Sequence, residues 1–354
     1  MTFSIYAKYA EIKEKWLQLL STLIISVIGS LFFVSVSLPL PWLLGALFTT
    51  TFAAMLGQNI WIPSWLRLAS LIILGALFGT TVSSSLLDDF LDWFPSMLAV
   101  TAYVLLVIPP IMLYLIRIVK MDVITAYFSA APGGLLPMTF IGGEMGGDAK
   151  IISLIQSSRI ILTVLIIPIS YAIFAGYTPT GEIGSGGSFI SMEPIGGFIL
   201  LGVSILGFII VKPIRIPTPA LMGPMISVSI MSLFGFTTAE VPDSLVAVAQ
   251  CLIGASIGAM FNNIKPRTVA RILFHGSVTS IYMIIFAVGA AIITFYLTEI
   301  PVNALILAFA PGGFAEMALV GFALGIDVAF VVAHQLSRYF FVILMLPIIF
   351  KMLK

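Results

Sequence analysis

Two arginines lie deep inside long apolar stretches of this sequence, where a charged side chain is costly and marks a candidate functional site. Asp148 begins the stretch of Arg159, and Asp327 begins the stretch of Arg338 at the same spacing. Because a helix rises about 1.5 Å per residue, each arginine is expected about 16 Å from the start of its helix. That depth is about half the thickness of the hydrocarbon core of a membrane.

Each arginine has polar neighbours on its own helix face. Gln156 and Gln335 precede Arg159 and Arg338 by three residues, and His334 stands beside Gln335. A guanidinium group binds a carboxylate through two parallel hydrogen bonds, so the pattern predicts coordination of an anion. The alternative is a structural arginine that donates hydrogen bonds to the backbone carbonyl groups at the tip of its own re-entrant loop.

A proline and two glycines precede each arginine and form the second candidate element of the site. Proline ends a helix and glycine permits a tight turn, so a new half-helix begins at each motif with free backbone N–H groups that attract anions. Broken helices of this kind commonly hold the binding site of transporters built from repeats, and a kink for packing is the alternative. We assign the substrate-binding site to both motifs and the four polar residues: Pro132, Gly133, Gly134, Gln156, Arg159, Pro311, Gly312, Gly313, Gln335 and Arg338.

Carboxylates near these motifs are candidates for coupling to an ion. Glu316 lies three residues after the second motif, at the position where the first half of the chain has Pro137. A lone carboxylate there is suited to carrying a proton or helping to hold Na+, and an ion pair with Arg338 is the alternative. We expect Glu316, Asp148 and Asp327 to form the ion-coupling set.

The composition identifies the class of protein that positions these residues. Of 354 residues, 60% are hydrophobic and only 9% are charged, whereas soluble domains carry about 25% charged residues. Soluble enzymes, DNA-binding domains, disulfide scaffolds and disordered chains are therefore excluded, and a net charge of +1 implies no attraction to nucleic acid. One cysteine and two histidines supply too few ligands for a metal centre, and no phosphate-binding loop motif occurs. We therefore expect neither enzymatic activity nor a cofactor or metal.

Comparison of the sequence with itself reveals an internal duplication. When residues 131–134 are laid on residues 310–313, both read Ala-Pro-Gly-Gly. The same alignment, without a gap, pairs further positions with identical residues: Met138, Gly142, Gly146, Asp148, Gln156, Ser158, Arg159 and Pro168. Earlier in the chain, an offset shorter by one position lays Pro41 and Gly45 on Pro219 and Gly223. So many matches at nearly one offset indicate two homologous halves.

Apolar stretches of spanning length occur about six times in each half, and open strands cannot satisfy their backbone in lipid, so every stretch is expected to be helical. One stretch per half, Val123–Met145 or Asn303–Leu324, is broken by its proline–glycine motif. The sequence predicts an all-α polytopic membrane protein of two inverted repeats, each with about five transmembrane helices and one re-entrant or broken helix. The expected divisions are a cytoplasmic N-terminal segment 1–15, membrane repeat 1 at 16–175, an extracytoplasmic linker 176–193 and membrane repeat 2 at 194–354.

Positive charges predict the orientation of the two halves. If each broken stretch enters and leaves on one side, each half crosses the membrane five times and the second half is inverted. Both termini are then cytoplasmic, and so are 14 of the 16 Lys and Arg residues, as is usual for positively charged loops: Lys8, Lys13, Lys15, Arg67, Arg117, Lys120, Lys150, Lys212, Arg215, Lys265, Arg267, Arg271, Lys351 and Lys354. A full crossing of the broken stretches would turn six of these cations outward and is the alternative.

The repeated pattern A-P-G-G-x-x-x-M-x-x-x-G-x-x-x-G-x-D, followed by Q-x-S-R and a proline, resembles the AbrB duplication family of bacterial membrane proteins over residues 16–354. Members carry labels such as ammonia monooxygenase or AbrB family regulator, and they are unrelated to the soluble DNA-binding protein of similar name. The usual P-G-G-x-x-E-M of the family is intact at Pro311–Met317, whereas Pro137 replaces its glutamate in the first half. The regulator label implies an influence on gene expression.

The layout also resembles cation–anion symporters with two inverted repeats, in which an arginine after a glycine-rich hairpin meets the substrate carboxylate. Arg159 and Arg338 are the matching positions. We therefore expect a secondary transporter of a small solute, foremost an organic anion, coupled to H+ or Na+ by alternating access in the bacterial plasma membrane. The lipid bilayer is the other expected partner, and a homodimer is compatible with the sequence. The alternative is a membrane-embedded regulator or sensor that binds a solute without moving it.

Overall fold

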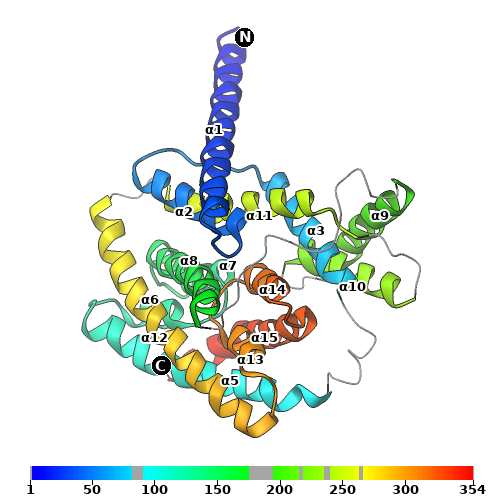
Figure 1. The fold of residues 1–354 in the computed structure, drawn as a ribbon. Coiled ribbons are helices and arrows are strands. Elements are labelled where there is room, and N and C mark those ends of the chain that lie inside the picture. The colour runs from blue at the N-terminus through cyan, green and yellow to red at the C-terminus, as the bar shows by residue number, and fades with distance from the viewer. Residues whose placement is uncertain are drawn as a thin grey trace. The chain divides into compact units, whose positions relative to one another are not determined.

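The computed structural model describes residues 2–81, 91–174, 194–214, 218–234, 240–262 and 266–353, so the linker 176–193 lies outside the described residues. These segments form helices and turns, with no strand in the part of the chain described (Figure 1). Seven helices are long and apolar enough to cross a membrane: Glu14–Ser35, Phe94–Arg117, Ala149–Ile173, Gly196–Ile214, Asp243–Phe261, Arg271–Thr298 and Val328–Met352. The chain is an all-α polytopic membrane protein, as the composition predicts.

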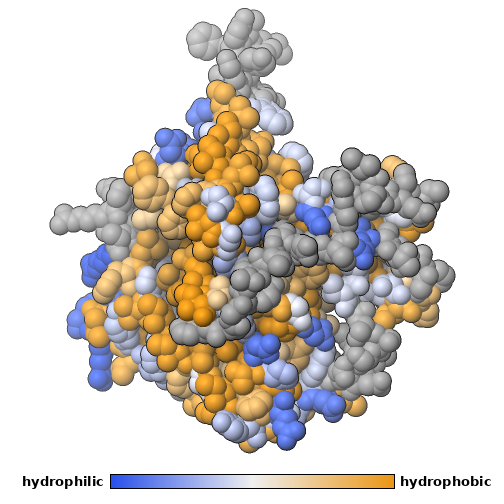
Figure 2. Space-filling view, in the orientation of Figure 1, coloured by the Kyte–Doolittle hydropathy of each residue, from blue (hydrophilic) through white to orange (hydrophobic). Residues whose placement is uncertain are grey.

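Large apolar side chains point outward from these helices. Figure 2 shows hydrophobic residues over much of the visible face. Phe32, Leu106, Phe198 and Ile285, from four different helices, each expose more than 60% of their surface. Contiguous apolar surface on this scale is unfavourable in water, so a lipid environment is what stabilises the exposed helix faces.

Three of the ten predicted spans are short, and they have the lengths that their apolar stretches predict. α2 (Pro41–Met55) and α10 (Pro219–Leu233) have 15 residues and α3 (Ser64–Thr80) has 17, which at 1.5 Å per residue gives lengths of about 22–26 Å. A proline at the first position of α2 and α10 sets where each begins, because proline has no N–H group for a hydrogen bond to an earlier turn. At the N-terminus, α1 (Thr2–Ser35) is continuous, so the predicted segment 1–15 and the first span form one helix.

The chain divides into two compact units, and each unit combines helices from both halves of the sequence. Unit 1 contains α1, α2 and α3 from the first half, and α9 (Pro194–Val211), α10 and α11 (Asp243–Gly258) from the second. Within it, α2 packs against α1 and α11 (Figure 1). Glycines permit these contacts: a Cβ on Gly45 would lie 2.5 Å from the Gly29 carbonyl oxygen, and one on Gly254 would lie 2.3 Å from the Leu43 oxygen.

The same contacts recur among the second-half helices of unit 1. A Cβ on Gly223 of α10 would lie 2.5 Å from the Gly207 oxygen of α9, which is the counterpart of the α1–α2 contact in the second half. A Cβ on Gly75 of α3 would lie 2.3 Å from the Leu221 oxygen of α10, which matches the contact between α11 and α2. Small residues at these crossings let helix backbones approach closely, as is usual in membrane helices.

Unit 2 holds the two broken stretches and the helices around them. Its helices are α5 (Phe94–Arg117), α6 (Val123–Ala130), α7 (Leu135–Glu144), α8 (Ala149–Phe174), α12 (Pro266–Thr298), α13 (Val302–Phe309), α14 (Phe314–Ala323) and α15 (Val328–Leu353). In Figure 1, α13 and α14 lie against α15. The triplets α6–α7–α8 and α13–α14–α15 match in length, with 8, 10 and 26 residues in each, and all three pairs begin at positions that the duplication aligns.

Candidate anion-binding site

Two broken helices form the centre of unit 2. The first broken helix consists of α6, residues 131–134 and α7, and the second consists of α13, residues 310–313 and α14. Each piece has 8 or 10 residues and is therefore about 12–15 Å long, half of a membrane span. The helices thus break at the proline–glycine motifs as predicted. A path that re-enters on one side stays a prediction.

Glycine is required in the first loop for two separate reasons. Gly134 has φ = 88°, in the left-handed region that side chains with a Cβ avoid. Gly133 lies so close to α15 that a Cβ would be 2.0 Å from the Cγ1 atom of Val342. A Cβ on Gly134 would also approach the Tyr339 ring at 3.1 Å, so α15 of the second half packs directly on the loop of the first half.

The two glutamines bind the loops that precede them. Gln156 Nε2 of α8 donates hydrogen bonds to the carbonyl oxygens of Phe128 at 2.8 Å and Ala131 at 3.0 Å. Gln335 Nε2 of α15 donates to the equivalent oxygens, those of Leu307 at 2.9 Å and Ala310 at 3.3 Å. The last carbonyl groups of a helix lack donors within that helix, so these glutamines cap the C-terminal ends of α6 and α13.

Arg159 joins the two loops to each other. Its Nη1 atom donates to the Ala131 oxygen of the first loop at 3.0 Å, and its Nε atom donates to the Pro311 oxygen of the second loop at 3.1 Å. Its Nη2 atom donates to Gln156 Oε1 of its own helix. Loops from opposite halves of the sequence are therefore held together by one guanidinium group.

Arg338 makes the matching contacts within its own half only. Its Nη1 atom donates to the Ala310 oxygen at 2.6 Å and the Phe309 oxygen at 3.3 Å, and its Nη2 atom donates to Gln335 Oε1 and to the Gly312 oxygen at 3.4 Å. These are the carbonyl contacts of the structural alternative raised from the sequence. The same contacts place both arginines beside the proline–glycine loops, as both interpretations require.

Burial sets the electrostatic character of the site. Arg159 exposes 3% and Arg338 4% of its surface, and the two guanidinium groups lie close enough for the charge of Arg338 to act on Arg159. All the hydrogen-bond acceptors described for these two groups are neutral oxygens. Two like charges thus share one buried site, an arrangement that a bound anion would stabilise.

Tyr103 of α5 is a site residue that sequence reasoning missed. Its side chain is buried, its ring packs on the Phe309 ring at a centroid distance of 5.6 Å, and it lies within electrostatic range of both guanidinium groups. Its hydroxyl donates to the Met283 oxygen of α12 at 3.3 Å. The signal available in the sequence was a hydroxyl-bearing aromatic residue inside an apolar span, which a search for charged residues passes over.

Glu316 lies at the start of α14, directly over the second loop. A Cβ on Gly313 would lie 2.0 Å from the Oε2 atom of Glu316, so the carboxylate occupies the space where a side chain would otherwise stand. Gly313 has an ordinary φ of −73°, in contrast to Gly134. Gly313 therefore leaves room for the carboxylate in the second loop, whereas the first loop needs glycine at Gly134 for its backbone conformation. The structure places Glu316 next to the loop that both arginines contact.

Asp148 and Asp327 lie apart from this group, at the N-terminal ends of α8 and α15. Asp148 Oδ1 accepts hydrogen bonds from the N–H groups of Lys150 at 2.9 Å and Ile151 at 3.1 Å. Asp327 Oδ1 accepts from Ala329 N–H at 2.8 Å and from the following residue at 3.4 Å. Both carboxylates cap a helix and are about 16 Å along it from the arginines. Their part in ion coupling stays a prediction.

Loss of one of these caps is expected to destabilise the protein without touching the arginine site. We expect Asp327→Ala to lower the free energy of unfolding by about 1 kcal/mol, because two N–H groups of the first turn lose their acceptor. Asp327→Asn keeps an acceptor oxygen and should unfold close to the wild-type temperature. Thermal unfolding of the purified protein measures both, and equal losses for the two variants would contradict a capping role.

His334 is near Arg338 in sequence but is directed elsewhere. Its Nε2 atom lies 2.7 Å from Ser96 Oγ, its Nδ1 atom lies 2.8 Å from the Phe330 oxygen, and its ring packs on the Phe330 ring at a centroid distance of 4.0 Å. It therefore joins α15 to α5, whereas Gln335 is the residue that contacts the arginine. In the part of the chain that the structure describes, no three His, Cys, Asp or Glu side chains gather closely enough to hold a metal ion.

Comparison with known proteins identifies the family to which the chain belongs. A family model described as "Transition state regulatory protein AbrB" matches residues 42–354. The chain is 30% identical to "Uncharacterized protein YhjN" of Bacillus subtilis (strain 168), with 93% of this chain and 91% of the relative covered. It is 23% identical to "Putative regulator AbrB" of Escherichia coli (strain K12), with 92% and 93% covered. The matched family model covers both broken helices and both arginines, and the chain belongs to the AbrB family of membrane proteins.

Proposed function

We propose that the chain is a secondary transporter that binds a small organic anion between its two broken helices and couples the movement of the anion to H+ or Na+. The observation that carries this proposal is the pair of buried arginines, whose described acceptors are all neutral oxygens. Burying a cation without a counter-ion is strongly unfavourable, so a negatively charged solute fits the site better than a neutral or cationic one.

The loops supply further donors for such a solute. α7 and α14 each begin at a loop glycine, and the first N–H groups of a helix have no partner within it. The helix dipole adds partial positive charge at the same place. A carboxylate bound there would contact guanidinium and backbone N–H groups together, which is a geometry that broken helices in transporters use.

Unpaired hydroxyl groups in the first half support a polar occupant of unit 2. Four buried hydroxyl groups of unit 2 lack a hydrogen-bond partner among the described residues. They belong to α6, α7 and α8: Ser129, Thr139, Ser158 and Thr163. Three of the second-half counterparts carry no hydroxyl: Ala308, Ala318 and Val342. Unpaired buried polar atoms are unfavourable, so water, a solute or a hard cation such as Na+ would stabilise the first half specifically.

Glu316 is the residue we assign to ion coupling. It is a half-buried carboxylate beside the loop that both arginines contact, and the first half has no equivalent. When Glu316 is charged it competes with a solute anion for the positive field of the arginines, and when it is protonated or paired with Na+ it does not. Binding of the cation and of the anion would then favour each other, as a symporter requires.

Replacing Glu316 by glutamine is expected to uncouple movement of the solute from movement of H+ or Na+. The neutral amide mimics the protonated acid, so solute binding and solute exchange across the membrane should persist, while accumulation driven by an H+ or Na+ gradient should be lost. Proteoliposomes loaded with solute measure exchange, and empty ones under an imposed gradient measure accumulation. Gradient-driven accumulation at the wild-type level in Glu316→Gln would exclude Glu316 as the coupling residue.

A binding screen followed by uptake tests the proposal directly. Purified protein is heated in the presence of acetate, succinate, citrate and neutral or amine-bearing solutes of the same size, and a carboxylate is expected to raise the unfolding temperature. The stabilising compound is then offered, radiolabelled, to proteoliposomes under H+ and Na+ gradients. Selective stabilisation by amines, or by none of the anions, would contradict an anion site.

A membrane regulator is the second candidate, because the Escherichia coli relative carries the word regulator in its name. Such a protein would use the same buried arginines to bind an anion without carrying it across. Stabilisation by a carboxylate combined with neither uptake nor exchange would favour this candidate. We place the protein in the bacterial plasma membrane with both termini in the cytoplasm, with no enzymatic activity, and labelling of cysteines introduced at Thr2 and Lys351 from either side tests the orientation.

A further inference from the structure

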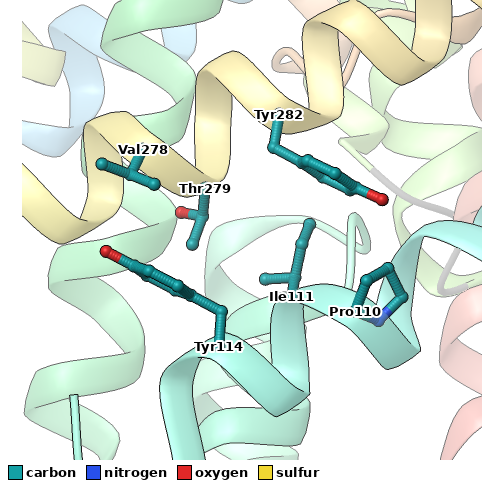
Figure 3. A pocket seen from close by; sticks show the side chains of 6 residues that line it. All are labelled: Pro110, Ile111, Tyr114, Val278, Thr279 and Tyr282. Atoms are coloured by element: carbon teal, nitrogen blue, oxygen red, sulfur yellow. The ribbon is translucent and has the colours of Figure 1, made fainter. Parts of the chain in front are cut away.

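A groove runs between α5 and α12 in unit 2, away from the loops that the arginines contact. It has a volume of about 220 Å³ and is lined by Pro110, Ile111, Tyr114, Val278, Thr279 and Tyr282 (Figure 3). Tyr282 extends from α12 over Pro110, and Tyr114 extends from α5 towards Val278 and Thr279. The Thr279 hydroxyl donates to the Gly276 oxygen of its own helix and is therefore already paired. The walls of the groove thus present few polar groups to a ligand.

α5 and α12 contact each other at both ends of the groove and are separated along its length. Tyr103 Oη donates to the Met283 oxygen at 3.3 Å, and Tyr114 Oη lies 2.9 Å from His275 Nδ1. The lining residues fall between these two contacts along both helices. Pro109 and Pro110 remove two N–H donors from α5 at this level, and proline inside a helix bends it. The space between the two helices at this level is lined by the six residues named above.

One end of the groove is polar and positively charged. Beyond Tyr114, the next turn of α5 ends at Arg117, and one turn before His275, α12 carries Arg271, whose charge acts on the His275 ring. Both arginines are exposed. They are also the terminal residues of the two candidate membrane spans, so this end of the groove is at the level where lipid headgroups lie.

We propose that the groove binds one acyl chain of an anionic phospholipid, with the lipid phosphate held by Arg117 and Arg271. The apolar walls match a hydrocarbon chain, the Tyr114–His275 pair lies at the level of the polar ester groups, and the two cations complement the phosphate. Cations beside an apolar groove between membrane helices are the chemistry that recognises acidic lipid headgroups. A zwitterionic lipid would fit the groove and carries the same phosphate, but its own choline cation offsets the attraction of the two arginines.

Occupancy of the groove would act on the helix that carries Arg159. Gly276 lies on α12 next to His275, and a Cβ on it would be 2.6 Å from Ser158 Oγ of α8, so the backbone of α12 packs tightly on the residue before Arg159. An acyl chain that wedges α5 from α12 would press on this contact. The lipid site is defined by its own residues, and it stands whether or not the chain transports an anion.

Native mass spectrometry of the purified protein tests the proposal with phosphatidylglycerol and phosphatidylcholine of identical chains. We expect the wild type to retain phosphatidylglycerol preferentially. In Arg117→Gln/Arg271→Gln, loss of two cations near the headgroup should weaken phosphatidylglycerol binding about thirtyfold and phosphatidylcholine binding several times less, because the choline cation already offsets the phosphate charge. Val278→Phe, which fills the groove, should weaken binding of both lipids.

Two matched controls keep the test specific. Arg67→Gln removes an exposed arginine of α3 in unit 1, and Val248→Phe enlarges an exposed valine of α11, so both should bind lipid as the wild type does. Equal retention of the two lipids by the wild type would overturn the proposal. Unchanged binding in Val278→Phe, or competition by soluble glycerol phosphate as effective as by phosphatidylglycerol, would show that no acyl chain occupies the groove and would also overturn it.

Discussion

Lysine in place of Arg159 is expected to weaken binding of the solute anion about tenfold to a hundredfold and to abolish its uptake. Lysine keeps the positive charge but cannot donate at once to Ala131, to Pro311 and to Gln156, as the guanidinium group does. One hydrogen bond to a charged group contributes about 1.5–3 kcal/mol, which corresponds to the expected loss of affinity. The shift in unfolding temperature with solute concentration measures the affinity.

Arg338→Lys provides the informative comparison. Of the two loops, Arg338 is described in contact with the second one alone. Its replacement should therefore leave the two loops joined and should reduce affinity less than Arg159→Lys does. Arg67→Lys, at an exposed site of α3, should bind and transport as the wild type does. If Arg159→Lys retained full affinity, the contact between the two loops would not be part of the binding site.

A single methyl group on Gly207 is expected to destabilise the protein by about 1–3 kcal/mol. A Cβ there would lie 2.3 Å from Ser227 Oγ and 2.4 Å from the Gly223 oxygen, so the backbones of α9 and α10 would have to separate. Gly202 is on the same helix, and nothing lies within 4 Å of the position of its Cβ. Gly202→Ala should therefore be neutral or raise stability by up to about 1 kcal/mol, since alanine favours the helix.

Thermal unfolding of both variants in the same detergent gives the comparison. Gly45→Ala should behave as Gly207→Ala does, because a Cβ on Gly45 would meet the Gly29 oxygen in the equivalent crossing of α1 and α2. Equal unfolding temperatures for Gly207→Ala and Gly202→Ala would mean that the helices separate at no cost, and the close crossing would then not stabilise unit 1.

The sequence predicted the local features of the site well. Proline and glycine are local signals, so the breaks at residues 131–134 and 310–313 were visible in the sequence, and the duplication anticipated that Gln156 and Gln335 would make matching contacts. The depth of Arg159 and Arg338 followed from counting residues along a helix. The apolar stretches also predicted the lengths of α2, α3 and α10, and each of these helices begins only one or two residues before the predicted start.

Contacts between distant segments could not be predicted. Nothing in the spacing of Arg159 indicates that its Nε atom reaches Pro311, because a hydrogen bond between residues so far apart in the chain leaves no periodic pattern. The packing of Val342 on Gly133 is hidden for the same reason. Duplication reveals which contacts are repeated within each half. Contacts made between the halves, such as that of Arg159, appear only in the folded chain.

The composition of the two units has a consequence for how the protein is made. The ribosome delivers the first half to the membrane before the second exists, and at that stage α2 has no α11 beside it and the first loop has no α15. Unit 1 can be completed only after α11 has been inserted, and unit 2 only after the last helix, Val328–Leu353. The newly inserted first half can form the α1–α2 crossing at once, but the face of α2 that packs on α11 and the loop face that packs on α15 must meanwhile be covered by lipid or by an insertion chaperone. Synthesis of the C-terminal helix is then the step that completes unit 2.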